Sequence, residues 1–192
     1  MLTQSEIKYN RLMEKAEELF CKLGYKSVSM DEIADAAGIS KMTIYKYFSS
    51  KEDLFIKVVE SVSDNAYLKL ESLINEVDGT IEKIDALLNF SLDSLRFFSV
   101  AFYKDVMDNQ YIAKKLIENK KTMSKKIFMD IIEEGIGKGE VRKLDVEFVA
   151  EFLNIMIDGM LTNYSELITS EVELKDFCNN FYDFLKYGLL GN

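Results

Sequence analysis

The chain has 192 residues, of which 48% are hydrophobic, and its formal net charge is −9. This size and apolar content are sufficient for a sizeable core in one or two domains. The absence of histidine excludes serine–histidine and cysteine–histidine catalytic pairs and histidine metal sites, and two cysteines are too few for a disulfide framework. We therefore expect no enzyme activity, no metal and no cofactor.

The absence of proline and the small number of glycines favour an all-α chain, in which helices end at glycine or at capping residues. No apolar run reaches the roughly eighteen residues of a membrane span. The first residues also lack the basic and apolar regions of a signal peptide. We expect a cytoplasmic protein with no membrane partner.

The first predicted helix covers residues 7–23, because apolar residues recur there at helical spacing opposite a charged side. Gly24 ends this helix. Ser29 and Glu32 then have the spacing of a capping box, which predicts a second helix beginning there. Gly38 predicts a tight turn, and Ser40 caps a third helix. This pattern of two short helices joined by a turn is a helix-turn-helix.

The predicted third helix presents a polar and apolar surface without negative charge. At about 100° per residue, Met42 and Lys46 lie opposite the apolar Ile44. No carboxylate occurs between Ser40 and Ser50. A helix in the major groove needs such a surface, because it offers donors and apolar groups to base edges and no negative charge to phosphates. The segment therefore predicts DNA binding.

Further residues support a family assignment: Phe20, Gly24, Tyr25, Ser29, Ile33, Ala34, Ala37, Gly38, Ile39, Ser40, Thr43, Ile44, Tyr45, Tyr47, Phe48, Ser50, Lys51, Glu52 and Leu54. In these positions the chain resembles the TetR family of bacterial transcriptional regulators. The family commonly has glycine where this chain has Met42. The resemblance implies a ligand-responsive regulator, most often a repressor, that binds a palindromic operator as a homodimer.

We expect double-stranded operator DNA to be contacted by a few placed groups. Residues 1–60 carry nine Lys and Arg against ten Asp and Glu, so most of the net negative charge lies further along the chain. Nonspecific affinity from a broad basic surface is therefore not expected. The predicted contacts are Ser29, Ser40, Lys41, Met42, Thr43, Tyr45, Lys46, Tyr47 and Lys51.

The predicted domains are a DNA-binding head at residues 1–50 and a helical ligand-binding and dimerisation domain at residues 51–192. A long helix starting near residue 51 joins them. Further helices are expected at residues 80–98, 100–107, 111–135, 145–164 and 170–187. The glycines at 135, 137 and 139 predict a turn between helices.

Aromatic and methionine side chains in the middle and late helices suggest a pocket for a small hydrophobic or amphipathic ligand. Arg96 would pair with an anionic group of such a ligand. For each aromatic residue the alternative is ordinary core packing, and for Arg96 it is an ion pair with a neighbouring acid such as Asp93. The candidates are Phe90, Arg96, Phe97, Phe102, Tyr103, Met123, Met156 and Met160.

The last two predicted helices are apolar over more of their surface than one core-facing stripe requires. This predicts pairing with a second copy in a four-helix bundle, as is usual in the TetR family, and the alternative is a monomer in which both helices are central. The predicted interface contains Phe148, Phe152, Ile155, Met156, Phe177, Phe181 and Phe184. For the function, the alternative is an all-helical small-molecule-binding or interaction protein that no longer binds DNA.

Overall fold

The computed structural model describes residues 3–162, and Glu173, Asp176, 179–181, 183–184 and 187–188 beyond them. Within this part, the side chains at 88, 91–97, 120, 154 and 157–162 are outside the description. The described residues form helices and no strands, which confirms the predicted all-α fold. None of the helices in this part is both long enough and apolar enough to span a membrane.

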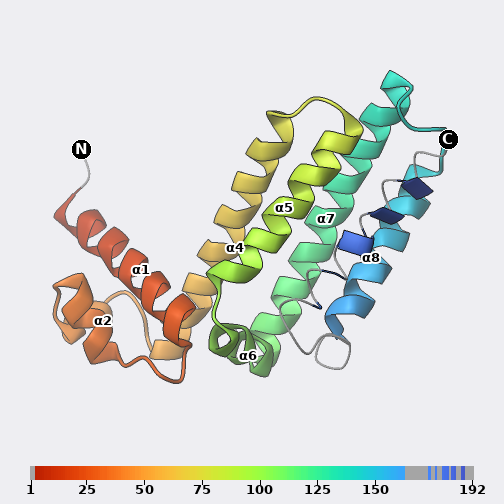
Figure 1. Cartoon of the computed structure of the whole chain (residues 1–192). Helices are drawn as coiled ribbons and strands as arrows, with labels where there is room; N and C mark the ends of the chain where they lie inside the picture. The colour runs from red at the N-terminus through yellow and green to blue at the C-terminus, as the bar shows by residue number, and fades with distance from the viewer. Residues whose placement is uncertain are drawn as a thin grey trace. The chain divides into compact units, whose positions relative to one another are not determined.

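The helices follow one another with short connections, as Figure 1 shows. Their bounds are α1 Gln4–Leu23, α2 Met30–Ala37, α3 Lys41–Ile44, α4 Lys51–Asn75, α5 Thr80–Phe97, α6 Val100–Asp108, α7 Gln110–Lys138 and α8 Val146–Thr162. These bounds agree with the predicted helices to within two residues, except that α1 begins three residues earlier, α3 is shorter and α7 ends three residues later. The helix predicted at 170–187 falls largely outside the described residues.

The chain divides into two compact units that are interleaved in the sequence. One consists of Met1–Ala66 and Ser94–Ile117, and the other of Tyr67–Asp93 and Glu118–Asn192. This division reflects packing. The predicted boundary at residue 50, between the DNA-binding head and the ligand-binding and dimerisation domain, concerns function and stays a prediction.

The first unit has its own core, built from α1, α2, α3, the start of α4, α6 and the start of α7. Large side chains at its centre have almost no exposed surface, and aromatic rings meet there edge to face, as Phe55 does with Phe20 at 5.2 Å and with Phe102 at 5.8 Å between ring centroids. The buried members include Leu12, Ala16, Phe20, Ile33, Ile44, Phe48, Leu54, Phe55, Val58, Phe102 and Val106. This core holds the helix-turn-helix to α6.

The second unit packs the later part of α4 with α5, α7 and α8, which lie side by side in Figure 1. Its core residues come from all four helices at helical spacing. They are Leu70, Ile74, Ile84, Leu87, Phe128, Ile131, Ala150 and Leu153. Burial of this apolar surface is the main force that assembles the four helices.

The predicted turn at residue 135 is wrong, because α7 continues through Gly135 and Gly137 to Lys138. A Cβ atom at position 135 would lie 2.3 Å from Oγ1 of Thr80 and 2.7 Å from Cγ2 of Val141. Glycine therefore lets α7 pack closely against these residues rather than ending the helix. The chain leaves the helix at Gly139, whose φ of 76° favours glycine.

Candidate nucleic-acid interface

Caps at both ends fix the position of α2. The Ser29 hydroxyl accepts a 3.2 Å hydrogen bond from the backbone N–H of Glu32, and the Glu32 carboxylate accepts one of 2.7 Å from the backbone N–H of Ser29. Hydrogen bonding of the Glu32 carboxylate to the side chain and backbone of Ser29 lowers the pKa of Glu32. The predicted capping box is confirmed. At the other end, Gly38 is left-handed, with φ 60° and ψ 40°, as predicted.

The turn between α2 and α3 is also fixed from outside. The guanidinium of Arg11 on α1 donates a 3.1 Å hydrogen bond to the carbonyl oxygen of Gly38. This contact satisfies a carbonyl at the end of α2, where the helix itself provides no partner. The helix-turn-helix is therefore attached to α1 at its turn as well as through the core.

The α3 helix begins where predicted, but its regular part is short. The Ser40 hydroxyl accepts a 3.1 Å hydrogen bond from the backbone N–H of Thr43, which confirms its role as N-cap. After Ile44 the chain continues in turns, in which the N–H of Lys46 bonds to Thr43 and that of Phe48 bonds to Ile44. Ile44 and Phe48 are buried in the core, so the opposite side of this segment is outward.

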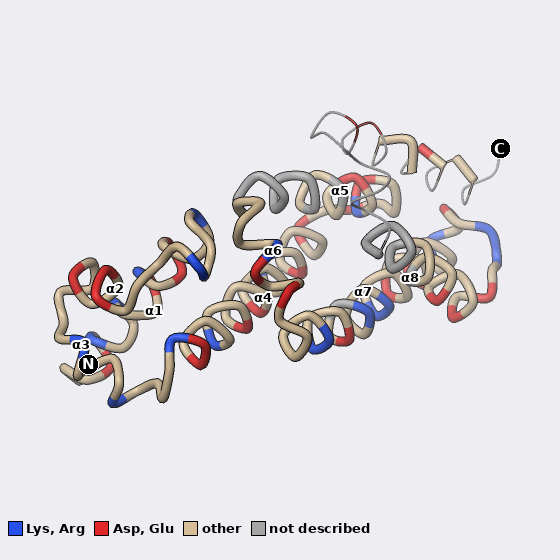
Figure 2. The backbone as a smooth tube through the Cα atoms, turned by 90° about the horizontal axis from the view of Figure 1, so that it is seen from below, with Lys and Arg blue, Asp and Glu red and all other residues tan. Residues whose placement is uncertain are grey.

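Three of the predicted DNA contacts project from that outward side. Met42 is 73% exposed and Tyr45 is 46% exposed. Lys46 is also exposed, and its ammonium group makes no ion pair or hydrogen bond within the described part of the chain. Figure 2 shows basic residues beside α3, whereas the acidic residues of the helix-turn-helix lie on α2.

Other predicted contacts are engaged within the head. Lys41 forms a 2.8 Å ion pair with Asp31, and this hydrogen bond raises the pKa of Lys41. The Oγ1 of Thr43 lies 2.8 Å from Oγ of Ser40. These side chains shape the surface around α3, and Lys41 also neutralises a carboxylate at the start of α2.

Tyr47 and Lys51 are partly buried. The Tyr47 hydroxyl donates a 3.1 Å hydrogen bond to the carbonyl oxygen of Ser5. The ammonium nitrogen of Lys51 lies 4.2 Å from the ring centroid of Tyr25, and burial lowers the pKa of Lys51. Both side chains lie beside the outward surface of α3 and stay predicted contacts.

Sequence reasoning missed a carboxylate that connects the first unit internally. Asp105 on α6 is buried, and it accepts a 3.2 Å hydrogen bond from the backbone N–H of Lys26, whose ammonium lies 3.3 Å away. The same ammonium pairs with Asp108 at 2.8 Å. These contacts attach α6 to the loop between α1 and α2. The available signal was that Asp105 shares the apolar face of α6 with Phe102 and Val106.

The predicted ligand residues lie in both units. Phe102 is buried in the core of the first unit and stacks on Phe98 at 5.2 Å, while Tyr103 is partly exposed. Phe90 packs against the core of the second unit. The remaining described candidates, Met123 and Met156, are not fully buried, and the side chains of Arg96, Phe97 and Met160 lie outside the description. The pocket stays a prediction.

The described part of the predicted dimer surface is concentrated on α8. Phe148 and Ile155 are 66% and 62% exposed, and Phe148 stacks on the partly exposed Phe152 at 6.3 Å. The opposite side of α8 carries Ala150 and Leu153 into the core. The further candidates Met156 and Phe181 are partly buried, Phe184 is exposed, and Phe177 lies outside the described residues. Helix α8 thus has two apolar sides.

Comparison with known proteins shows which family the helix-turn-helix head is similar to. Residues 12–58 match the family described as "Bacterial regulatory proteins, tetR family". The chain is 26% identical over 162 residues to the HTH-type transcriptional repressor KstR2 of Mycolicibacterium smegmatis, an alignment that covers 79% of this chain and 76% of that protein.

Two crystal structures show the same fold. A transcriptional regulator from Cytophaga hutchinsonii superposes with a TM-score of 0.82 and 18% identity over 96% of this chain and 99% of that one. The transcriptional regulator FadR from Bacillus subtilis, in complex with stearoyl-CoA, gives a TM-score of 0.64 and 23% identity over 94% and 99% of the two chains. At these identities the likeness bears on the fold alone.

Proposed function

Because this chain belongs to the TetR family of bacterial regulatory proteins, we propose that it is a ligand-responsive repressor that binds a palindromic operator as a homodimer. Residues 1–50 bind the DNA in this proposal, and residues 51–192 bind the ligand and a second copy of the chain. The protein acts in the cytoplasm, where bacterial DNA is found, and has no catalytic role.

The outward surface of α3 is the observation that carries this proposal. Helix caps at Ser29 and Ser40, together with the bond from Arg11 to Gly38, hold the helix-turn-helix in one arrangement. The exposed side then offers Met42 of α3 and Lys46 of the following turn, with no carboxylate between Ser40 and Ser50. In helix-turn-helix proteins, the second helix enters the major groove and its N-terminal residues contact base edges.

The exposed side of α8 supports the homodimer. A contiguous apolar surface that includes Phe148 and Ile155 is costly to leave in water. Burying the same surface of two chains against each other gives a two-fold symmetric interface. Two heads held in this way can contact two half-sites one helical turn of DNA apart, or a multiple of it, which requires a palindromic operator.

The ligand in this proposal is a small hydrophobic or amphipathic molecule. FadR of Bacillus subtilis, which shares the fold, is seen with stearoyl-CoA. Such a molecule releases the operator only if it binds more tightly to a conformation that does not fit DNA. The proposal therefore requires one compound that both raises the melting temperature and releases DNA.

Selection from a random-sequence duplex library tests the proposal directly. We expect the purified full-length protein to retain fragments that share an inverted repeat, and one bound duplex to carry two chains. Lys46→Ala in the same selection provides a matched comparison with a weakened α3 surface. Retention of no specific fragment would instead favour an all-helical ligand-binding or interaction protein that no longer binds DNA.

A further inference from the structure

We propose that Met42 selects thymine in the operator by packing its side chain against the 5-methyl group of that base in the major groove. The inference rests on the proposed function, and it adds the chemistry by which one residue distinguishes base pairs. The partner is double-stranded DNA with a thymine at a defined position in each half-site.

The position of Met42 suits contact with a base edge. It is the second residue of α3, and N-terminal residues of a recognition helix are those that reach the bases. Its side chain is 73% exposed, while Ile44 on the same helix has no exposed surface and anchors the helix in the core. The thioether therefore projects from a firmly placed backbone.

The polar side chains around Met42 are poorly suited to reading bases. Bidentate recognition of guanine, adenine or cytosine commonly uses arginine or lysine, asparagine or glutamine, and carboxylates, respectively. Residues 40–48 contain lysines but none of the other types. Lys41 pairs with Asp31 at 2.8 Å, and the hydroxyls of Ser40 and Thr43 lie 2.8 Å apart. Polar readout by these groups would compete with contacts they already make.

Lys46 has a different role in this arrangement. It follows the regular part of α3, where the chain continues in turns, and its charge is exposed. A compact ammonium on a flexible chain acts as a point charge that suits a phosphate, whereas the rigid fork by which arginine reads guanine is absent. The apolar Met42 is then the exposed α3 side chain nearest the N-terminal end that can discriminate bases without a hydrogen bond.

Thymine matches this side chain chemically. Its 5-methyl group is the apolar feature that distinguishes it in the major groove. Methionine is unbranched and polarizable, so its side chain adapts to an irregular apolar surface. Removing one buried methyl group is expected to weaken binding about fourfold, which corresponds to roughly 0.8 kcal/mol.

Replacing thymine with deoxyuridine tests the inference, because this removes the methyl group and keeps the base pairing. The probe is the duplex obtained by selection with the wild-type protein, with each thymine of one half-site replaced in turn. We expect replacement at one groove-facing position to lower wild-type affinity about fourfold. Met42→Ala should bind the thymine and uracil duplexes alike, whereas Met42→Leu should keep a preference for thymine. Since Met42 is exposed, both variants should have the same melting temperature as the wild type.

Two outcomes would overturn the inference while leaving the proposed function intact. One is tight wild-type binding that is indifferent to uracil at every position. The other is a loss on uracil substitution that persists unchanged in Met42→Ala. Failure of the wild-type protein to retain any specific duplex would instead overturn the proposed function, and the inference with it.

Discussion

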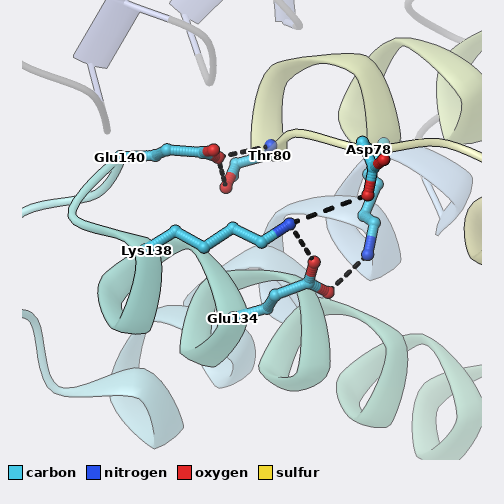
Figure 3. Close-up of polar contacts among 6 residues, drawn as sticks. Asp78, Thr80, Glu134, Lys138 and Glu140 are labelled. Atoms are coloured by element: carbon cyan, nitrogen blue, oxygen red, sulfur yellow. Dashed lines mark hydrogen bonds and ion pairs between the residues drawn. The ribbon is translucent and has the colours of Figure 1, made fainter.

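Glu140 caps helix α5 from 60 residues away in the sequence: its Oε2 atom accepts 2.8 Å hydrogen bonds from both the backbone N–H and the hydroxyl of Thr80 (Figure 3). Thr80 is the first residue of α5, and the preceding Gly79 has no side chain with which to cap the helix. Figure 3 also shows Glu134 paired with Lys138 on α7, at 2.7 Å. The Thr80–Glu140 bonds join the start of α5 to the residue two positions after α7, and Lys83 of α5 pairs with Glu134 of α7.

Replacing Glu140 with alanine should lower the melting temperature. The substitution leaves the N–H of Thr80 without its acceptor at a helix end, where no bond within the helix replaces it. Glu140→Gln, which keeps one amide oxygen, should melt between the alanine variant and the wild type. Calorimetry measures both, and equal melting temperatures for all three proteins would show that this cap contributes nothing.

Gly135→Ala and Gly137→Ala should change stability in opposite directions, although both glycines lie in α7. The added Cβ at 135 would lie 2.3 Å from Oγ1 of Thr80, so we expect a loss of about 1–3 kcal/mol. At 137 the added Cβ would have no atom within 4 Å in the described part of the chain, apart from its chain neighbours and the backbone of its own helix. Removing a flexible glycine from a helix should then stabilise by about 0.5–1 kcal/mol. Urea unfolding measures both free energies, and a stabilising Gly135→Ala would contradict the close packing.

The ion pairs of Glu134 should make stability depend on acid pH. Hydrogen bonds from Lys138 and Lys83 lower the pKa of Glu134 to about 2, below the ordinary value of 4.5. A lowered folded-state pKa stabilises the fold above the ordinary pKa, and this contribution is lost as the pH falls toward 2. We therefore expect Glu134→Gln to be less stable than wild type at pH 7.

The difference in melting temperature between wild type and Glu134→Gln should shrink between pH 4.5 and pH 2. Asp130→Asn is a suitable control, because Asp130 lies one turn earlier on α7 and its exposed carboxylate has no ion-pair or hydrogen-bond partner among the described residues. A constant difference across this range would mean that the Glu134 carboxylate is not the source of the effect.

Lys46→Ala should weaken DNA binding through loss of one phosphate contact. We expect affinities for selected and unrelated duplexes to fall by a similar factor, and the slope of log affinity against log salt to decrease by about one. Lys69→Ala removes the same charge from an exposed position on α4 and should leave the slope unchanged. Binding titrations at several salt concentrations measure this slope. Equal slopes for wild type and Lys46→Ala would show that Lys46 does not contact a DNA phosphate.

Phe148→Glu should dissociate the proposed dimer without unfolding the chain. Phe148 is 66% exposed on α8, so a carboxylate there is tolerated in a single chain but would be buried and unpaired in an interface. Sedimentation should show monomers, and tight operator binding should be lost. Leu153→Ala, on the buried side of α8, should instead lower the unfolding free energy by about 2–5 kcal/mol. A Phe148→Glu protein that remains dimeric would show that this surface of α8 is not the dimer interface.

Much of the helix-turn-helix could be predicted because its signals are local. Ser29 and Glu32 are three residues apart, and Ser40 and Thr43 have the same spacing, so each cap forms within a single turn. Gly38 adopts the left-handed conformation that ends α2 because glycine has no side chain, so this signal depends on a single residue. The helical spacing of the apolar residues also predicted that Met42 and Lys46 point outward.

The sequence by itself therefore determined the all-α fold, the order of helices and the outward surface of α3. Only the tertiary structure decided what depends on partners remote in the chain. It paired Asp105 with Lys26, placed Lys51 over Tyr25, and brought Glu140 to the start of α5. The local sequence of three glycines near residue 135 suggests a turn, yet α7 continues through Gly135. The missing side chain of Gly135 lets Thr80 and Val141 pack closely against the helix. Spacing along a chain predicts contacts within a turn of helix, whereas contacts between helices follow from which apolar faces the whole chain can bury together.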